Sequence, residues 1–181
     1  RFRYLFIKYN QIQNVMLFRN HGPSSGTSLV HPHSQIIGTA VVPQYIQQNE
    51  QTAEEYYHRN GRCLICSLRE RELDDRSRCL FTNRSFTAFV PYAAEVPFEI
   101  WIVPNRHRAS FADIGEDEAY DLSEALRDTL GRLFLRLDNP DYNYMIRTCS
   151  KQKAQSEAIH WFLQILPRTS HKSGFELGTG L

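Results

Sequence analysis

The sequence predicts an α+β fold in which an antiparallel sheet is flanked by helices. Three observations carry this prediction. Short runs rich in β-branched and aromatic residues are bounded by Pro, Gly or Asn, which is typical of strands. One long segment repeats its apolar residues at helical spacing. Two pairs of strand candidates also look like copies of each other, which indicates two related halves.

The first part of the chain offers two strand candidates joined by a loop. Residues 14–20 (NVMLFRN) are an apolar strand candidate, and the loop HGPSSGTS leads to a second candidate at residues 29–43 (LVHPHSQIIGTAVVP). The polar segment 47–62 has helical character through Tyr57 and a helix-stopping glycine at Gly61. We therefore expect a strand, a loop and a strand, followed by a helical connector.

The remaining chain offers four more strand candidates and the longest helix. Residues 85–93 (SFTAFVPYA) and 97–107 (PFEIWIVPNRH) are strand candidates that we expect to pair as neighbours. From Asp113 onward, early acidic residues precede apolar residues near helical spacing, which indicates an amphipathic helix. Those apolar residues are Tyr120, Leu122, Leu126, Leu130, Leu133 and Leu137. Residues 142–148 (YNYMIRT) and 159–168 (IHWFLQILPR) are the last two strand candidates.

An internal repeat is indicated by matching separations in the two parts of the chain. Asn14 precedes His31 by as many residues as Asn143 precedes His160. The overlay places His31 on His160, His33 on Phe162 and Gln35 on Gln164. The second copy would then keep the first histidine and the glutamine but lose the middle histidine. We expect residues 1–60 to close one half and residues 61–181 to form the other.

Composition excludes several classes of partner. The 21 Lys and Arg residues are balanced by 20 Asp and Glu, so no broad electrostatic attraction to nucleic acid or to an anionic membrane is expected. With 181 residues, 41% of them hydrophobic, the chain can bury a core. No apolar run approaches the roughly 20 residues that span a bilayer, and the start RFRYLFIKYN does not resemble a signal peptide. We therefore expect a globular, cytoplasmic protein without nucleic-acid or membrane partners. Because the chain starts without Met, we also expect it to be part of a longer polypeptide.

Two histidines and a glutamine alternate directly after a small-residue loop. On a strand, His31, His33 and Gln35 would share one face. A neutral imidazole can attack phosphorus and form a covalent phosphoramidate, and a nearby amide can donate to a phosphate oxygen. Gly22 and Gly26 let backbone N–H groups approach a phosphate closely. A single strand histidine is more often an ordinary half-buried residue, but this combination favours chemistry at phosphorus.

A pair of cysteines in the segment CLIC indicates a metal site. Cys63 and Cys66 have the spacing of a metal half-site or a redox pair. A tetrahedral zinc ion needs two further ligands, and His107 and His160 are available. Because no thioredoxin-like βαβ pattern surrounds the cysteines, the sequence predicts a zinc site. The alternatives are that His107 is an exposed loop residue and that His160 is a core histidine.

The segment FRNHGPSSGTSLVHPHSQ resembles the active-site signature of the galactose-1-phosphate uridylyltransferase family, a branch of the histidine-triad superfamily. This resemblance covers nearly the whole chain and implies two histidine-triad-like halves. It implies that His33 is the nucleophile that becomes nucleotidylated and that Gln35 holds the phosphate of the intermediate. Histidine-triad hydrolases carry a third histidine where this chain has Gln35, so transfer is implied rather than hydrolysis. The positions that fall where the family contacts nucleotide phosphates are Asn20, Gly26, Thr27 and Ser28.

The same resemblance extends to the metal and to the C-terminal segment. It supports zinc at the cysteine and histidine cluster, and it makes His31 a ligand of a further zinc whose cysteine partners would lie before Arg1. The segment GFELGTG resembles the part of the family that reaches the acceptor sugar phosphate, often in the partner subunit, so a homodimer is expected. The implied contacts are Lys172, Phe175 and Glu176, although a solvated tail remains an alternative.

The leading functional interpretation is a ping-pong nucleotidyltransferase that moves UMP between UDP-glucose and galactose 1-phosphate. The HPHSQ segment also resembles the plant ADP-glucose phosphorylase type, which gives an alternative with inorganic phosphate as the acceptor. A non-catalytic module that binds zinc or a nucleotide is the third hypothesis. The intact alternation of His33 and Gln35 argues against the third.

Overall fold

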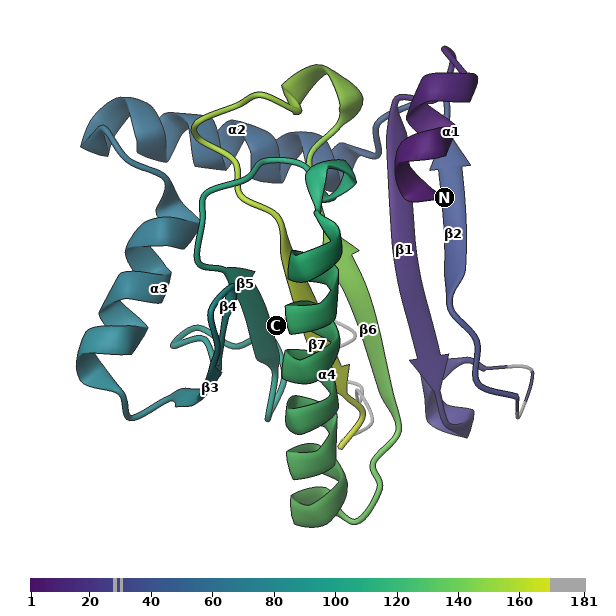
Figure 1. Cartoon of the computed structure of the whole chain (residues 1–181), viewed down its shortest axis with the longest axis vertical. Coiled ribbons are helices and arrows are strands. Elements are labelled where there is room, and N and C mark those ends of the chain that lie inside the picture. Colours follow the sequence, from purple (N-terminus) through teal and green to yellow (C-terminus); the bar gives the residue numbers. More distant parts are fainter. Residues whose placement is uncertain (28, 30, 170–181) are drawn as a thin grey trace, which may run out of the picture.

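The computed structural model describes residues 1–27, 29 and 31–169, and these residues form an α+β fold on one antiparallel sheet (Figure 1). The helices are α1 (Phe2–Lys8), α2 (Gln44–Asn60), α3 (Leu64–Asp75) and α4 (Glu116–Leu137). The strands are β1 (Asn14–His21), β2 (Gln35–Thr39), β3 (Cys79–Thr82), β4 (Phe86–Phe89), β5 (Ile100–Pro104), β6 (Tyr142–Arg147) and β7 (Phe162–Pro167). Their order across the sheet is β2-β1-β6-β7-β5-β4-β3. The predicted fold class is confirmed, as is the pairing of β4 with β5.

Helix α4 packs its apolar stripe on one face of the sheet. Ala125 and Leu133 are buried there, and the core beneath them includes Trp161 and Ile102. Tyr120 was expected on the same stripe, but it is 75% exposed. The expectation was wrong because residues two apart on a helix point about 200° apart, so Tyr120 faces away from the stripe on which Leu122 lies.

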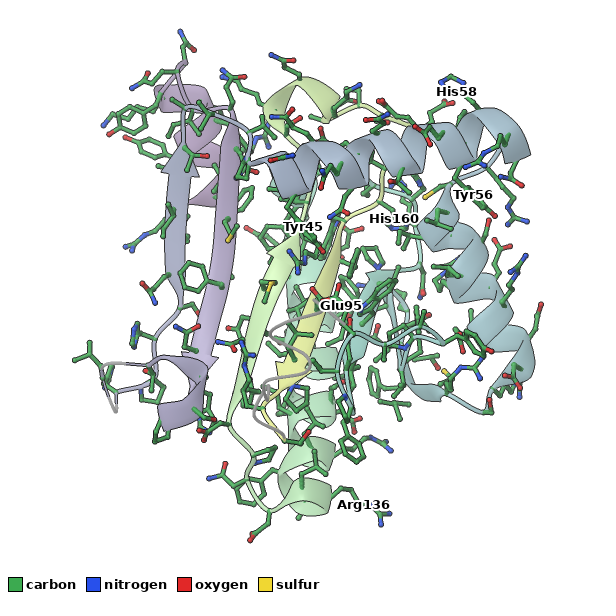
Figure 2. The ribbon with its side chains drawn as sticks, turned by 180° about the vertical axis from the view of Figure 1, so that it is seen from behind. Tyr45, Tyr56, His58, Glu95, Arg136 and His160 are labelled. Atoms are coloured by element: carbon green, nitrogen blue, oxygen red, sulfur yellow. The ribbon has the colours of Figure 1, made fainter. Side chains whose placement is uncertain are left out.

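Helix α2 lies across the opposite face of the sheet, as the two views show (Figures 1 and 2). It ends where the sequence predicted, at Gly61, whose φ of 67° is the left-handed value that glycine adopts easily. Helix α3 follows almost at once, and α1 packs beside β1. None of the helices among the described residues is long and apolar enough to cross a membrane.

The strand predicted over residues 29–43 is much shorter in the structure. Among the described residues of this segment only β2 is a strand, and residues 31–34 are irregular. Pro32 has no N–H to donate to a ladder, and Pro43 already precedes the first turn of α2. The expectation that His31 and His33 share a strand face with Gln35 was therefore wrong.

The pairing register does not confirm the predicted internal repeat. Gln35 on β2 pairs with Phe18 on β1, whereas Gln164 on β7 pairs with Met145 on β6. The overlay of the two segments places Phe18 on Arg147, so a true repeat would pair Gln164 with Arg147. The observed partner is Met145, and the two hairpins therefore differ by two residues in register. Because β1 also pairs directly with β6, the strands of both expected halves form one continuous sheet, and the division at residue 60 stays a prediction.

Candidate functional site

Four side chains of the types that bind metal ions converge beside α3. Cys63 caps the N-terminus of α3 and Cys66 lies in its first turn, while His107 follows β5 and His160 precedes β7. Their donor atoms all lie within 4.8 Å of one another. Figure 2 shows His160 beneath α2, close to the start of β7. The predicted group of four is confirmed as a cluster that could hold a metal ion.

The spacing of these atoms fits a tetrahedral metal. Cys66 Sγ lies 3.5 Å from His107 Nδ1 and 3.3 Å from His160 Nδ1. In a tetrahedral zinc site, with bonds of about 2.3 Å to sulfur and 2.0 Å to nitrogen, a sulfur and a nitrogen ligand lie roughly 3.5 Å apart. Two thiols and two imidazoles are also a donor set that zinc prefers.

A hydrogen bond outside the cluster orients one of the imidazoles. His107 Nε2 donates to the carbonyl oxygen of Ser156 at 3.2 Å, since a carbonyl can only accept. The lone pair of His107 is then on Nδ1, the atom that faces Cys66. Such an outer hydrogen bond is typical of metal-binding histidines.

The pKa shifts favour the metal-binding form in two of the four groups, Cys63 and His160. The hydrogen bond from Cys66 is the largest cause that lowers the pKa of Cys63, and it raises the pKa of Cys66 in turn. The pKa of His107 is raised, chiefly by its hydrogen bond with Cys63. Burial lowers the pKa of His160, which keeps that imidazole neutral. A thiolate and a neutral imidazole are the forms that bind a metal.

Two contacts hold the ligand-bearing segments together. The backbone N–H of Trp161 donates to the carbonyl of Arg108 at 2.9 Å, which joins the neighbours of His160 and His107. Arg69 Nη1 on α3 donates to the carbonyl of Asn105 at 2.6 Å. The cluster therefore forms from three separate parts of the chain that the fold itself connects.

The second region of interest is the loop that follows β1. Gly22 and Gly26 both have a φ of 82°, on either side of a short 3-10 turn. Asp141, just before β6, accepts hydrogen bonds from the backbone N–H of Ser24 at 2.6 Å and from its hydroxyl at 2.5 Å. These bonds, the hydroxyl first, hold the pKa of Asp141 below its usual value. The loop is thus anchored to a strand that lies far away in the sequence.

A cavity of about 370 Å³ opens beside this loop. Two residues expected at the nucleotide site, Asn20 and Thr27, line it, together with Arg19, His31 and Asp141. His33, Gln35 and Gly26 are not among its lining residues. The expected contacts Ser28, Lys172, Phe175 and Glu176 lie outside the described residues. The structure therefore brings together only part of the predicted nucleotide site.

A backbone contact fixes the tautomer of His33, the predicted nucleophile. Its Nδ1 lies 2.8 Å from the carbonyl oxygen of His31. Because the carbonyl accepts, Nδ1 carries the hydrogen and Nε2 keeps its lone pair. Within the described part of the chain, no cluster of potential metal ligands includes His31, so its role as a zinc ligand stays a prediction.

Sequence reasoning missed two residues that support the loop. Asn143 Nδ2 on β6 donates to Asn20 Oδ1 at 2.8 Å and to the carbonyl of Ser25 at 2.9 Å. Arg168 Nε donates to Asn143 Oδ1 at 2.7 Å. No local pattern signals these contacts, because the partners are brought together only by the pairing of β1 with β6.

Comparison with known proteins gives a consistent result. Residues 47–161 match the family described as galactose-1-phosphate uridyl transferase, C-terminal domain, and residues 4–42 match an N-terminal domain of unknown function. ADP-glucose phosphorylase of Arabidopsis thaliana is 34% identical over 96% of this chain and 48% of its own length. Galactose-1-phosphate uridylyltransferase of Thermotoga maritima is 26% identical over 87% of this chain and 47% of its own length.

Solved structures agree with these relatives. The crystal structure of the Arabidopsis thaliana ADP-glucose phosphorylase with bound ADP-glucose superposes with a TM-score of 0.85 at 33% identity, over 96% of this chain and 54% of that one. A uridylyltransferase structure superposes with a TM-score of 0.87 at 33% identity, over 96% of this chain and 56% of that one. The chain spans about half the length of the curated relatives it matches.

Proposed function

The chain belongs to the galactose-1-phosphate uridylyltransferase family, and from that membership we propose that it takes part in nucleotidyl transfer through a covalent nucleotidyl-histidine on His33. The observation that carries this proposal is the hydrogen bond from His33 Nδ1 to the His31 carbonyl. It leaves Nε2 as the nucleophilic atom and holds the ring in one tautomer.

The proposed reaction has two displacements at phosphorus. His33 Nε2 attacks the α-phosphorus of a nucleoside diphosphate sugar, a nitrogen–phosphorus bond forms, and the bond to the sugar 1-phosphate breaks. An oxygen of a phosphorylated acceptor or of phosphate then attacks the same phosphorus and releases the histidine. Gln35 is proposed to hold the phosphate, and the loop with Asn20 and Gly26 to present N–H groups to its oxygens.

The identity of the nucleotide is a choice between two candidates. The 34% identity to ADP-glucose phosphorylase over nearly the whole chain favours AMP transfer from ADP-glucose to inorganic phosphate. The second candidate is UMP transfer between UDP-glucose and galactose 1-phosphate, supported by the family match and by the relative from Thermotoga maritima. Both use the same proposed nucleophile and differ in base and acceptor.

We further propose that the cluster of Cys63, Cys66, His107 and His160 holds a structural zinc ion. When bound, the metal would cross-link α3 to the segments beside β5 and β7. The proposed contacts of Lys172, Phe175 and Glu176 with the acceptor, and a homodimer that would use them, remain predictions from the sequence.

Intact mass spectrometry tests the reaction. The full chain is incubated separately with ADP-glucose and with UDP-glucose, and the modified peptide is mapped. An AMP-sized increment on His33 supports the phosphorylase candidate, and a UMP-sized one supports the uridylyltransferase candidate. His33→Ala should abolish the adduct, whereas the matched control His58→Ala, on the exposed end of α2 (Figure 2), should keep it. An adduct that persists in His33→Ala, or no adduct from either donor, contradicts the proposal.

A further inference from the structure

We propose that the cavity between α2 and the sheet is a second ligand site, which binds a planar aromatic anion. The cavity has a volume of about 270 Å³ and is lined by residues of α2, α3, β1, β5, β6 and β7, and by His160. It lies on the face of the sheet opposite α4 (Figure 2) and shares no lining residue with the cavity beside the His33 loop. The proposal goes beyond the proposed nucleotidyl transfer and does not depend on it.

Arg147 supplies the cationic group of this site. Its Nε donates to Gln164 Oε1 at 2.6 Å, and the guanidinium carbon lies 5.1 Å from the centre of the Tyr45 ring. Among the described residues, its terminal nitrogens have neither a hydrogen bond nor an ion pair. The flat fork of N–H groups that remains suits a carboxylate or a phosphate.

Aromatic side chains supply a surface for a flat ring. Trp101 and Phe162 pack together with ring centres 4.4 Å apart, and both line the cavity. Tyr45, at the start of α2, also lines the cavity and is 48% exposed. Planar ligands gain from stacking on such rings in addition to the apolar area they bury.

A buried hydrogen-bond chain holds these groups in place without a ligand. Glu99 is fully buried, and its Oε1 accepts from Trp101 Nε1 and from Gln164 Nε2, each at 2.6 Å. The Gln164 amide is thereby fixed with its oxygen toward Arg147. A pre-organised chain of this kind lowers the entropic cost of binding.

Two carboxylates decide which way the ligand lies. Glu50 and Glu95 also line the cavity, and Glu50 Oε1 already accepts from the backbone N–H of Ser150 at 2.6 Å. Figure 2 shows Tyr45 on α2 and Glu95 lower on the same face. Because like charges repel, the anionic group must lie at Arg147, while ring N–H or amino groups suit the acidic parts of the wall.

Fluorescence of Trp101 tests the site, with AMP, adenosine and inorganic phosphate as probes. The only other tryptophan, Trp161, is 2% exposed in the core. AMP should quench the emission saturably, with an apparent Kd at least about tenfold below those of adenosine and phosphate, because only AMP combines a ring and an anion. Trp101→Phe should remove the signal. Absence of saturable quenching, or equal affinity for adenosine or for phosphate, overturns the proposal.

Variants assign the signal to this cavity. Arg147→Gln should raise the Kd for AMP about tenfold or more, whereas the matched control Arg136→Gln, exposed near the end of α4 (Figure 2), should leave it unchanged. Tyr45→Ala, at a half-exposed position, supplies a second variant if Arg147→Gln melts early. The quench should persist in His33→Ala, which separates this site from the proposed reaction centre. An unchanged Kd in both cavity variants, or loss of quenching in His33→Ala, overturns the proposal.

Discussion

The side-chain amide of Asn143 on β6 donates a hydrogen bond to Oδ1 of Asn20 on β1 across 2.8 Å. The same amide group reaches the carbonyl of Ser25, and Arg168 fixes its orientation by donating to its oxygen. Asn20, which was expected to contact the nucleotide phosphates, is therefore positioned by a residue of β6 and by the residue that follows β7.

Asn143→Ala should loosen the phosphate loop. The substitution leaves Asn20 Oδ1 and the Ser25 carbonyl without their partner at a site where Asn143 is 8% exposed. A buried polar group that loses its partner costs about 1–3 kcal/mol, so urea unfolding should show a loss of that size. Nucleotidylation of His33 should also slow. Asn60→Ala, which removes only an exposed bond within α2, is the matched control; equal losses in both variants would contradict the role of Asn143.

Alanine at the two loop glycines should give different losses of stability. Gly22 and Gly26 have the same φ of 82°, so backbone strain should destabilise both alanine variants by about 1 kcal/mol. A Cβ at Gly22 would also lie 1.7 Å from Oδ1 of Asp141, whereas nothing lies within 4 Å at Gly26. Gly22→Ala should therefore lose about 1–3 kcal/mol more than Gly26→Ala in chemical denaturation. Equal losses would show that Asp141 moves aside freely.

Acidification should release the loop from Asp141. Its pKa is lowered by the Ser24 hydrogen bonds, so these bonds stabilise the fold above the unfolded pKa, near 3.8, and are lost as the pH falls through the lower folded value. Because the carboxyl is exposed, the expected change in stability is small, and it is best measured by comparing a variant with the parent chain. Melting temperatures from about pH 6 to about pH 3 should fall less steeply in Asp141→Asn than in the parent chain. Parallel curves would contradict this account.

Cys63→Ser should remove most of the bound zinc and lower the melting temperature. Loss of one thiolate leaves an incomplete tetrahedral set, and metal binding that is coupled to folding contributes directly to stability. The zinc content is measured by atomic absorption after dialysis. Cys79→Ser, on β3 and outside the cluster, should keep the metal and is the matched control. Unchanged zinc and melting in Cys63→Ser would rule out the site.

Local patterns predicted the elements that carry clear periodicity or a clear stop signal. Helix α4 and the end of α2 at Gly61 were found in this way, as were the strands at the centre of the sheet. Helices α1 and α3 and strand β3 were missed. The seven residues of α1 and the four of β3 are too short for a periodic pattern, and most of α3 is polar.

The candidate sites, too, were predictable from the sequence only where residue type or a local pattern indicates them. The metal cluster was predictable because cysteine and histidine are common metal ligands, so their residue type alone indicates a possible site even when they are far apart in sequence. The contact of Asn143 with Asn20 was not, because amides occur everywhere and only strand pairing brings these two together. Likewise, the alternation of His31 with His33 indicated a strand, but Pro32 interrupts the ladder.

The placement of the four metal ligands has a consequence for how the chain folds. Cys63 and Cys66 precede β3, β4 and β5, while His160 follows β6, so an ion held by all four closes two long loops at once. Closing such loops restricts the unfolded ensemble, as a disulfide does. During synthesis the cysteines emerge well before His160, so an ion at the proposed site would be bound only loosely until β7 is made. Full coordination would therefore be a late event that coincides with β7 joining β6 to β5 in the described sheet.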